Sequence, residues 1–151
     1  MCEIREISFT EFSNSSSYSG LIDGYESECT YEGFPPANLN KDLYKKLNDM
    51  GILKVFGAYL GDLLVGYCCL LISPNLHFSA PIGTVESFFV FKEHRNTGAG
   101  LKLLKAVEHV SKNNGAISLS LSTKKNSLLE KVMEGMKDYH QSNVVYMKRL
   151  I

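Results

Sequence analysis

One arginine and two glycines at close spacing form the segment of this chain best suited to chemistry. Residues 88–101 read FFVFKEHRNTGAGL, which places Arg95-x-x-Gly98-x-Gly100 between an apolar run and an amphipathic run. Gly98 and Gly100 lack the Cβ atoms that would hold an anionic ligand away from the backbone. The first turn of a following helix offers unpaired N–H donors and a partial positive charge. The segment therefore predicts a pyrophosphate site between a strand and a helix.

Two better-known phosphate-binding motifs are excluded by single residues. A dinucleotide fingerprint would need a third glycine at position 103, where Leu103 stands. A P-loop would need Gly-Lys-Ser/Thr, whereas Gly100 is followed by Leu101 and Lys102. The plainest alternative is a strand, a glycine-rich turn and a helix that bind no ligand. The elements around the motif therefore have to support the ligand-binding interpretation.

Length and charge bound the class of protein. The 151 residues suffice for a single domain over 1–151 with a sizeable core, and leave little room for two. The 16 basic and 16 acidic residues balance, which argues against a nucleic-acid partner and gives no polybasic membrane signal. No apolar run approaches the roughly 20 residues that span a bilayer, and no N-terminal apolar segment suggests secretion. We expect a cytoplasmic protein.

Cysteine and histidine spacing gives no metal site. The four cysteines include no CxxC pair, so we interpret them as buried, reduced thiols. The four histidines also lack the spacing of metal ligands. We expect no metal.

Hydrophobic patterning predicts six strands and four helices. The predicted strands cover 4–9, 52–60, 63–72, 85–91, 116–122 and 143–150, and the predicted helices cover 21–29, 41–50, 101–112 and 126–136. Asn38 or Asn40 can cap the second helix, and Asn126 or Ser127 the fourth. The segment 73–81 is expected to be an irregular loop. This order of elements predicts a mixed α/β sheet with helices on its faces.

The element order, with Arg-x-x-Gly-x-Gly before the long third helix, resembles the GNAT superfamily of N-acetyltransferases. The resemblance covers nearly the whole chain and is most specific in VESFFVFKEHRNTGAGLKLLKAVEH, residues 85–109. It includes Glu86, four residues before Val90, and the tail VVYMKRL as a final strand. It implies an α/β (α+β) fold with a mixed, mostly antiparallel sheet of six to seven strands and about four helices.

The resemblance implies acetyl-CoA as the acyl donor. The pyrophosphate would be held by the N–H groups of the turn, from residues Asn96, Thr97, Gly98, Ala99 and Gly100. Arg95 would either pair with a phosphate or anchor the loop to the protein. The pantetheine arm would follow the main chain of Phe89, Val90 and Phe91. Asn126 matches a position that often hydrogen-bonds CoA, and its alternative role is the helix cap.

The implied reaction is the attack of an amine on the thioester. A protonated amine must first lose a proton, and Glu86 is the leading candidate for base or positioning residue. The alternative is that Glu86 has no catalytic role and is a solvated or salt-bridged residue of the strand. Glu86 lies two residues before Phe88, so we expect both on one face of the strand. A backbone N–H near Phe88 and Phe89 can stabilise the developing oxyanion.

The catalytic acid is less clearly marked. Many members of the superfamily use a tyrosine partway along the fourth helix, where this chain has Lys131 to Glu134. Tyr139 is the nearest phenol. It is expected to serve either as the acid or as a structural aromatic residue. Ser122 or a water molecule is the other candidate.

The acceptor site would be built by the first helix, the loop after it and the 73–81 loop. Tyr25, Glu26, Glu28 and Tyr31 form an acidic, aromatic cluster that suits a cationic amine, unless it is a solvated helix face. The predicted function is transfer of an acetyl group from acetyl-CoA to a primary amine of a small molecule or protein. The alternative is a non-catalytic acyl-CoA-binding or protein-interaction module on the same fold. If the final strand is an edge, a homodimer is reasonable.

Overall fold

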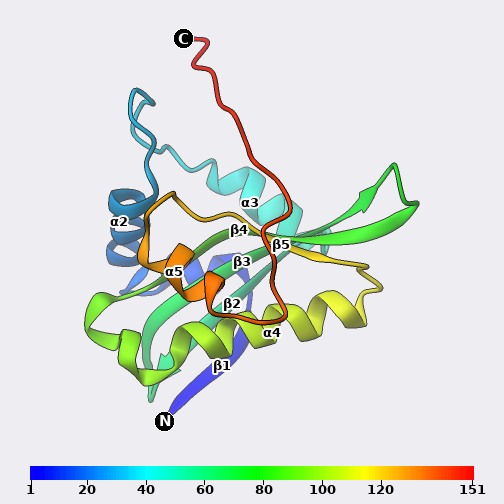
Figure 1. The fold of residues 1–151 in the computed structure, drawn as a ribbon. Helices are drawn as coiled ribbons and strands as arrows, with labels where there is room; N and C mark the ends of the chain where they lie inside the picture. Colours follow the sequence, from blue (N-terminus) through cyan, green and yellow to red (C-terminus); the bar gives the residue numbers. More distant parts are fainter.

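A five-stranded sheet in the order β1-β2-β3-β4-β5 forms the centre of the computed structural model, which describes residues 1–151 (Figure 1). The strands are β1 (Cys2–Ile7), β2 (Leu53–Leu60), β3 (Leu63–Asn75), β4 (Ala80–Val90) and β5 (Leu119–Leu121). The first four strands pair antiparallel with their neighbours, and β5 pairs parallel to β4. The predicted mixed and mostly antiparallel sheet is therefore confirmed.

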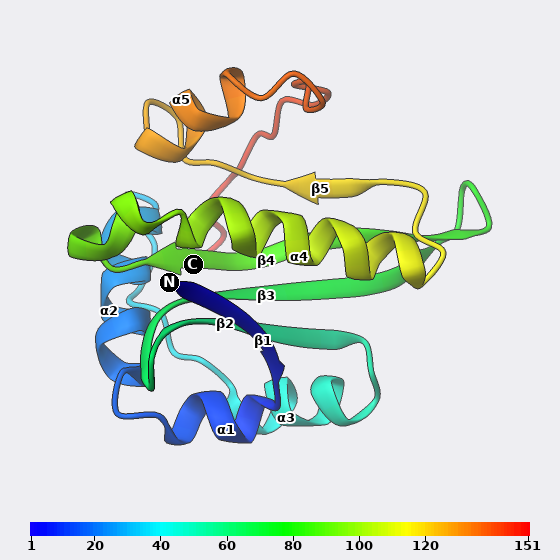
Figure 2. The ribbon, with the colours of Figure 1, turned by 90° about the horizontal axis from the view of Figure 1, so that it is seen from below.

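Helices cover both faces of this sheet. They are α1 (Phe9–Asn14), α2 (Tyr18–Cys29), α3 (Lys41–Asp49), α4 (Ala99–Asn113) and α5 (Leu128–Glu134), with a 3-10 helix η1 (Lys92–Thr97) before α4. Figure 2 shows α4 lying along the sheet and well separated from α1 and α3. None of the helices is long and apolar enough to cross a membrane.

Two hydrophobic cores lie on the two faces of the sheet. The first joins α1 and α2 to the sheet and includes Phe12 and Leu21, while the second lies under α4 and includes Leu103. Side chains alternate between the faces of a strand. Tyr67 of β3 therefore belongs to the first core and Cys68 to the second. Both faces of β3 are covered, which explains its unbroken apolar run.

The structure shows which of the predicted capping residues form the N-caps of α3 and α5. The Asn40 side chain accepts a hydrogen bond from the Leu43 N–H at 3.0 Å, so Asn40 rather than Asn38 caps α3. Ser127 caps α5 by accepting from the Glu130 N–H at 3.1 Å. Asn126 lies just outside this cap with a φ of 64°, and its own N–H donates to the Glu130 carboxylate.

Three predicted segments differ from the structure. The segment 73–81 is not an irregular loop, because Ser73 pairs with Ile82 and Asn75 with Ala80, which extends the β3–β4 hairpin. This hairpin points away from α2 (Figure 1), so it does not build a site at that helix. Residues 116–122 contribute only the three residues of β5.

The third difference is the C-terminal tail. Residues 143–150 form no strand, and the side chains of Val144, Val145 and Tyr146 are exposed. A strand needs a partner edge, and β5 offers an edge of only three residues. The sheet therefore has five strands instead of six or seven.

Three of the four cysteines are buried as predicted. All four are free thiols, with Cys2, Cys68 and Cys69 buried and Cys29 half-buried. Burial raises the pKa of the Cys69 thiol. Cys69 is therefore a packing residue rather than a nucleophile.

We predict that Gly24→Ala destabilises the fold because α2 lies directly on β4. A Cβ at Gly24 would lie 2.4 Å from Cζ of Phe89. The Phe89 ring is buried and contacts the Phe91 ring at a centroid distance of 6.2 Å, which limits its movement. Overpacking of this kind costs about 1–3 kcal/mol and outweighs the helix propensity of alanine. Urea unfolding measures the change.

Gly20→Ala is the matched control in the same helix. Its Cβ would lie 3.2 Å from Phe91 Cζ, so a small adjustment suffices. Its stability should stay within about 1 kcal/mol of the wild type, since alanine favours a helix. Equal stability of the two variants would contradict the close contact between α2 and Phe89.

Candidate functional site

One edge of β4 loses its partner strand halfway along. β4 pairs with β3 as far as Val90, but with β5 only from Gly83 to Val85. The Phe91 N–H donates to the Val65 carbonyl of β3 at 3.0 Å. Main-chain groups alternate between the two edges of a strand, so those of Phe88 and Val90 point to the edge that β5 has left. This open edge offers main-chain hydrogen bonds to a ligand.

The residues that direct their main chain to the open edge differ from those that the sequence predicted for the pantetheine arm. Of the predicted residues Phe89, Val90 and Phe91, only Val90 directs its main chain to this edge. The Phe91 N–H is used by β3, and its carbonyl accepts from the His94 N–H at 2.9 Å. Phe88, which the sequence indicates only for the oxyanion, also directs its main chain to this edge, and this alternation can be assigned only once the register with β3 is known.

The turn after β4 directs free N–H groups into open space. η1 leads into Gly98, whose φ is +79°, and α4 begins at Ala99. The first main-chain bond of α4 joins the Lys102 N–H to the Gly98 carbonyl at 3.0 Å. The N–H groups of Gly100 and Leu101 therefore lack an acceptor within the helix, whereas the Ala99 N–H donates to Thr97 Oγ1 at 3.4 Å. Their position at a helix N-terminus suits an anion, which fits the predicted pyrophosphate.

The two glycines of the motif have different roles. A Cβ at Gly98 would meet no atom within 4 Å. Glycine is therefore favoured at this position by its left-handed backbone conformation rather than by close packing, and the space beside it is open. A Cβ at Gly100 would lie 3.4 Å from Cζ of Phe88. The start of α4 thus packs against the Phe88 ring at ordinary van der Waals distance.

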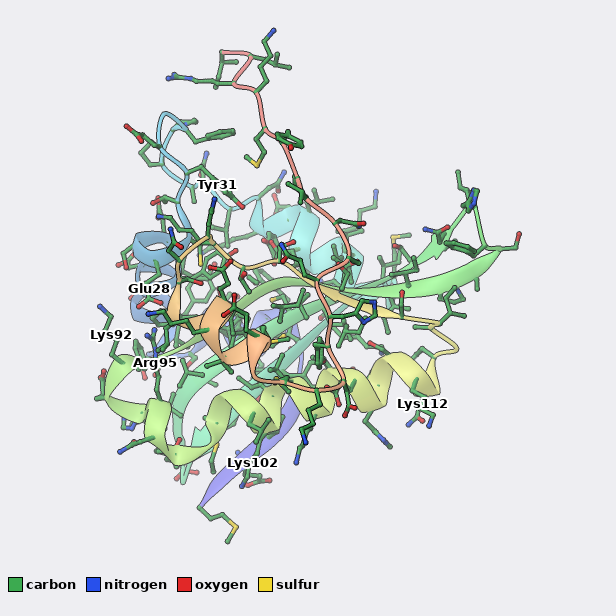
Figure 3. The ribbon with its side chains drawn as sticks, viewed as in Figure 1. Glu28, Tyr31, Lys92, Arg95, Lys102 and Lys112 are labelled. Carbon is green, nitrogen blue, oxygen red and sulfur yellow. The ribbon has the colours of Figure 1, made fainter.

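Arg95 is held by the protein itself. One of its terminal nitrogens (Nη2) lies 2.8 and 2.9 Å from the two carboxylate oxygens of Glu28 on α2, and its Nε donates to the Val90 carbonyl at 3.0 Å. Figure 3 shows Arg95 and Glu28 pointing toward each other, with Lys92 nearby. The guanidinium also lies 5.3 Å from the centroid of the Phe89 ring. Of its two predicted roles, these contacts support the anchor.

Glu86 stands at a β-bulge. Cys69 of β3 pairs with Ser87 and Leu70 with Val85, which leaves Glu86 as an extra residue without a partner. Tyr44 Oη donates to one carboxylate oxygen of Glu86 at 2.5 Å, and Ser87 Oγ donates to the other at 2.7 Å. Two donors therefore fix the half-buried carboxylate.

The bulge overturns the expectation that Glu86 and Phe88 share a face. Phe88 packs against the core under α4, whereas Glu86 faces α3 through Tyr44. One extra residue changes the alternation of the strand, so residues two apart across the bulge point to opposite faces. The carboxylate consequently lies on the same side of the sheet as α1, α2 and α3.

Tyr44 is the site residue that sequence reasoning missed. It lies on α3, and its ring stacks on Phe9 with a centroid distance of 5.1 Å. Burial, and secondarily its hydrogen bond to Glu86, raises the pKa of the Tyr44 hydroxyl. Tyr44 therefore remains a neutral donor to the carboxylate. A polar atom on the apolar face of the 41–50 helix was the available signal, because a buried tyrosine hydroxyl needs a partner.

Tyr139 lies on the other side of the sheet from Tyr44. Its hydroxyl donates to a carboxylate oxygen of Glu108 on α4 at 2.6 Å. Burial, and secondarily Glu108, raises the pKa of Tyr139, which keeps the phenol protonated. This contact gives Tyr139 a structural role between α4 and the segment after α5.

The acidic cluster predicted around α2 is largely engaged within the protein. Glu28 binds Arg95, and a carboxylate oxygen of Glu26 accepts from the Ala37 N–H at 2.7 Å. Tyr25, Glu26 and Tyr31 line a small pocket beside α2. The side chains of His, Cys, Asp and Glu form no group that could hold a metal ion.

Comparisons with known proteins agree with this architecture. The model of the acetyltransferase (GNAT) family matches residues 21–132, and the chain belongs to this family. No curated protein matches the chain in sequence.

Solved structures share the GNAT fold across the whole chain. A ribosomal-protein-alanine N-acetyltransferase from Brucella melitensis biovar Abortus 2308 is 16% identical with a TM-score of 0.76, covering 99% of this chain and 100% of that one. The aminoglycoside acetyltransferase meta-AAC0020 from an uncultured soil metagenomic sample is 17% identical with a TM-score of 0.76, covering 99% and 97%. The aminoglycoside N-acetyltransferase AAC(6')-Iy in complex with CoA is 19% identical with a TM-score of 0.71, covering 100% and 96%. At these identities the likeness establishes the fold alone.

We predict that Arg95 and Glu28 are energetically coupled in the ligand-free protein. Their side chains are 28% and 34% exposed, so solvent weakens the pair without removing it. A double-mutant cycle with Arg95→Met and Glu28→Gln should give a coupling free energy of about 1 kcal/mol. Urea unfolding of the four proteins measures it.

The pair Lys45 and Asp49 is the matched control. It joins neighbouring turns of α3 at 2.8 Å, and its side chains are 57% and 63% exposed. Such a pair contributes about 0.3–0.5 kcal/mol. Additive effects of the Arg95 and Glu28 substitutions would show that Arg95 is not an anchor in solution.

Proposed function

We propose that this protein transfers an acetyl group from acetyl-CoA to a primary amine of a small molecule or protein. The observation that carries the proposal is the junction of two sets of free donors. The open edge of β4 provides N–H groups at Phe88 and Val90, and the start of α4 provides them at Gly100 and Leu101. The start of α4 lies against the Phe88 ring at Gly100, so both sets lie toward the same end of β4.

These donors suit the two parts of an acyl-CoA. N–H groups at a helix N-terminus stabilise a pyrophosphate through hydrogen bonds and the helix dipole, each contributing about 0.3–1 kcal/mol. Amides of an extended arm pair with the open edge of a strand in the manner of an added strand. Acetyl-CoA supplies the activated thioester, and the chain supplies orientation along Phe88 and Val90.

Glu86 is the proposed base or positioning residue for the amine. A carboxylate has about four lone-pair sites, and Tyr44 and Ser87 use two of them. The remaining sites can hold an ammonium group and accept its proton, directly or through water. The two fixed donors restrict rotation of the carboxylate, which keeps an accepting oxygen in one place.

Tyr139 is the proposed acid for the departing thiolate. The raised pKa of Tyr139 keeps a proton on the phenol. Tyr139 and the Phe88 side chain both lie on the face of the sheet that α4 covers. The hydroxyl would have to leave Glu108 in order to donate. Helix α5 itself carries no tyrosine that could replace Tyr139 as the acid. The need to break the bond to Glu108 therefore favours the alternative function, a non-catalytic acyl-CoA-binding or protein-interaction module.

We predict that Gly98→Asn removes acetyl-CoA binding without unfolding the protein. Asparagine tolerates a left-handed backbone better than other non-glycine residues, and its side chain would fill the space above the α4 N-terminus. A thermal-shift titration with acetyl-CoA, CoA and NAD measures binding. A ligand at 100 times its Kd adds about 2.7 kcal/mol of stability, which the variant should lose.

Gly115→Asn is the matched control for backbone strain. Gly115 has a φ of +77° and no atom within 4 Å of its Cβ position, but it lies beyond the other end of α4. This variant should keep the full shift with acetyl-CoA. A wild-type protein that no CoA compound stabilises would rule out the proposed function and the alternative module together.

We predict that Glu86→Gln lowers kcat/KM by about 10²–10⁴, because the amide cannot accept the proton of the amine. Tyr44→Phe keeps the stacking on Phe9 and loses one hydrogen bond to the carboxylate, so it should lower kcat/KM by about tenfold. Release of CoA thiol in the presence of amines measures both. The thermal shift with acetyl-CoA should stay unchanged in the two variants.

Tyr139→Phe tests the proposed acid in the same assay. A fall in kcat with an unchanged thermal shift supports the catalytic role, whereas unchanged kcat assigns Tyr139 to packing against α4. Stabilisation by acetyl-CoA with no thiol release for any amine would instead establish the binding module.

A further inference from the structure

A small pocket lies where α2 ends and the loop after it begins. Tyr25 and Glu26 line it from the helix. The loop contributes Tyr31, Phe34 and Pro35. The pocket has a volume of about 170 Å³. An apolar cavity of roughly 150 Å³ holds one benzene molecule, and a trimethylammonium group is of similar size. The pocket can therefore admit one compact group.

Aromatic rings form much of the pocket wall. The ring centroids of Tyr31 and Phe34 lie 5.8 Å apart, and the Phe34 N–H donates to the Tyr31 carbonyl at 3.2 Å. A cation is attracted to a ring face within about 6 Å of its centroid, so one cation can lie within reach of both rings. Tyr25 is the third ring of the wall and packs edge-on against Tyr67 at 6.4 Å. The pocket thus gathers three rings that can attract a cationic group.

Glu26 gives the pocket a negative charge that the protein does not neutralise. Its carboxylate oxygen Oε1 accepts from the Ala37 N–H at 2.7 Å, which holds the side chain between α2 and the loop. No lysine, arginine or histidine forms an ion pair with Glu26, whereas the neighbouring Glu28 pairs with Arg95 at 2.8 Å. A carboxylate without a cationic partner therefore stands beside the three aromatic rings.

The end of α2 adds to this preference for positive charge. The C-terminal end of a helix carries a partial negative charge, which a basic residue in the last turn usually offsets. The last turn of α2 contains no basic residue. Arg149 of the tail lies 3.8 Å from the Cβ position of Gly33, but it does not line the pocket. The helix end and Glu26 therefore act on a ligand in the pocket with the same sign.

We propose that this pocket binds a trimethylammonium group, carried by a small molecule or by a methylated lysine side chain. A primary ammonium has three N–H donors and needs acceptors for them, whereas a quaternary ammonium has none and is held by charge and ring faces. Five of the eight residues that line the pocket are hydrophobic, which suits the methyl groups. A quaternary nitrogen cannot be acetylated, so the bound group is a recognition element, and its binding is independent of the proposed transfer.

The test is a titration of the protein with three probes, each followed by the NMR signal of its methyl protons. The probes are choline, the amide of acetylated trimethyl-lysine, and 3,3-dimethylbutan-1-ol, the neutral isostere of choline. Choline should bind at least about tenfold more tightly than the alcohol, because only the cation is attracted by the rings and by Glu26. Tighter binding of choline identifies a small molecule as the source, and tighter binding of trimethyl-lysine identifies a side chain. Equal affinity for choline and the alcohol, or no saturable binding of either cation, would overturn the proposal.

Glu26→Gln and Tyr31→Leu test the two kinds of contact separately. Glu26→Gln removes the charge and keeps an oxygen that can accept from the Ala37 N–H. Tyr31→Leu removes a ring whose residue is 51% exposed, so the core is unaffected. Each variant should weaken choline binding at least about threefold. Urea unfolding confirms that both variants fold.

Glu32→Gln and Tyr146→Leu are the matched controls. Glu32 lies in the same loop but does not line the pocket, and Tyr146 is 91% exposed on the tail. Neither control should change the affinity for choline. Equal losses in Glu26→Gln and Glu32→Gln would reduce the effect to net charge, and unchanged affinity in either pocket variant would place the cation elsewhere. Each of these results would overturn the proposal.

Discussion

The unequal pairing of the two edges of β4 is the constraint on which the rest of the site depends. On one edge β3 holds β4 rigidly as far as Val90, and on the other β5 departs after Val85. An unpaired strand edge in the interior of a protein is costly unless something accepts its hydrogen bonds. The bulge at Glu86 begins where the second partner is lost, so one irregularity both opens the edge and turns a carboxylate toward α3.

The loop that follows β4 keeps its shape through contacts that are remote in sequence. Arg95 joins the last residues of β4 to Glu28 on α2, and Gly98 completes the turn with a backbone that other residues rarely adopt. Arginine suits this anchor because its planar group bonds Glu28 through Nη2 and the Val90 carbonyl through Nε, which fixes its direction as well as its distance. The free N–H groups at the start of α4 are thereby held in place before any ligand arrives, which lowers the entropic cost of binding.

Local features of the site could be predicted from the sequence, and tertiary ones could not. Gly98 and Gly100, the amphipathic α4 and the caps at Asn40 and Ser127 depend on neighbouring residues, so their patterns are visible in the chain. The bulge at Glu86 depends on the register with β3, and Tyr44 reaches Glu86 across 42 positions. The apolar tail fits a strand by composition, yet composition does not provide the partner edge that a strand needs.

Helix α2 takes part in two proposed binding surfaces at once. Gly24 rests on the ring of Phe89, Glu28 binds Arg95 of the loop before α4, and Tyr25 lines the small pocket at the end of α2. A displacement of this helix would therefore alter the open edge of β4, where we propose that the acyl donor binds, together with this pocket. Thermodynamic linkage makes such an effect reciprocal: the factor by which a bound donor changes the affinity of the pocket for its ligand equals the factor by which that ligand changes donor affinity. The helix thus gives the two ligands a structural route to cooperative binding.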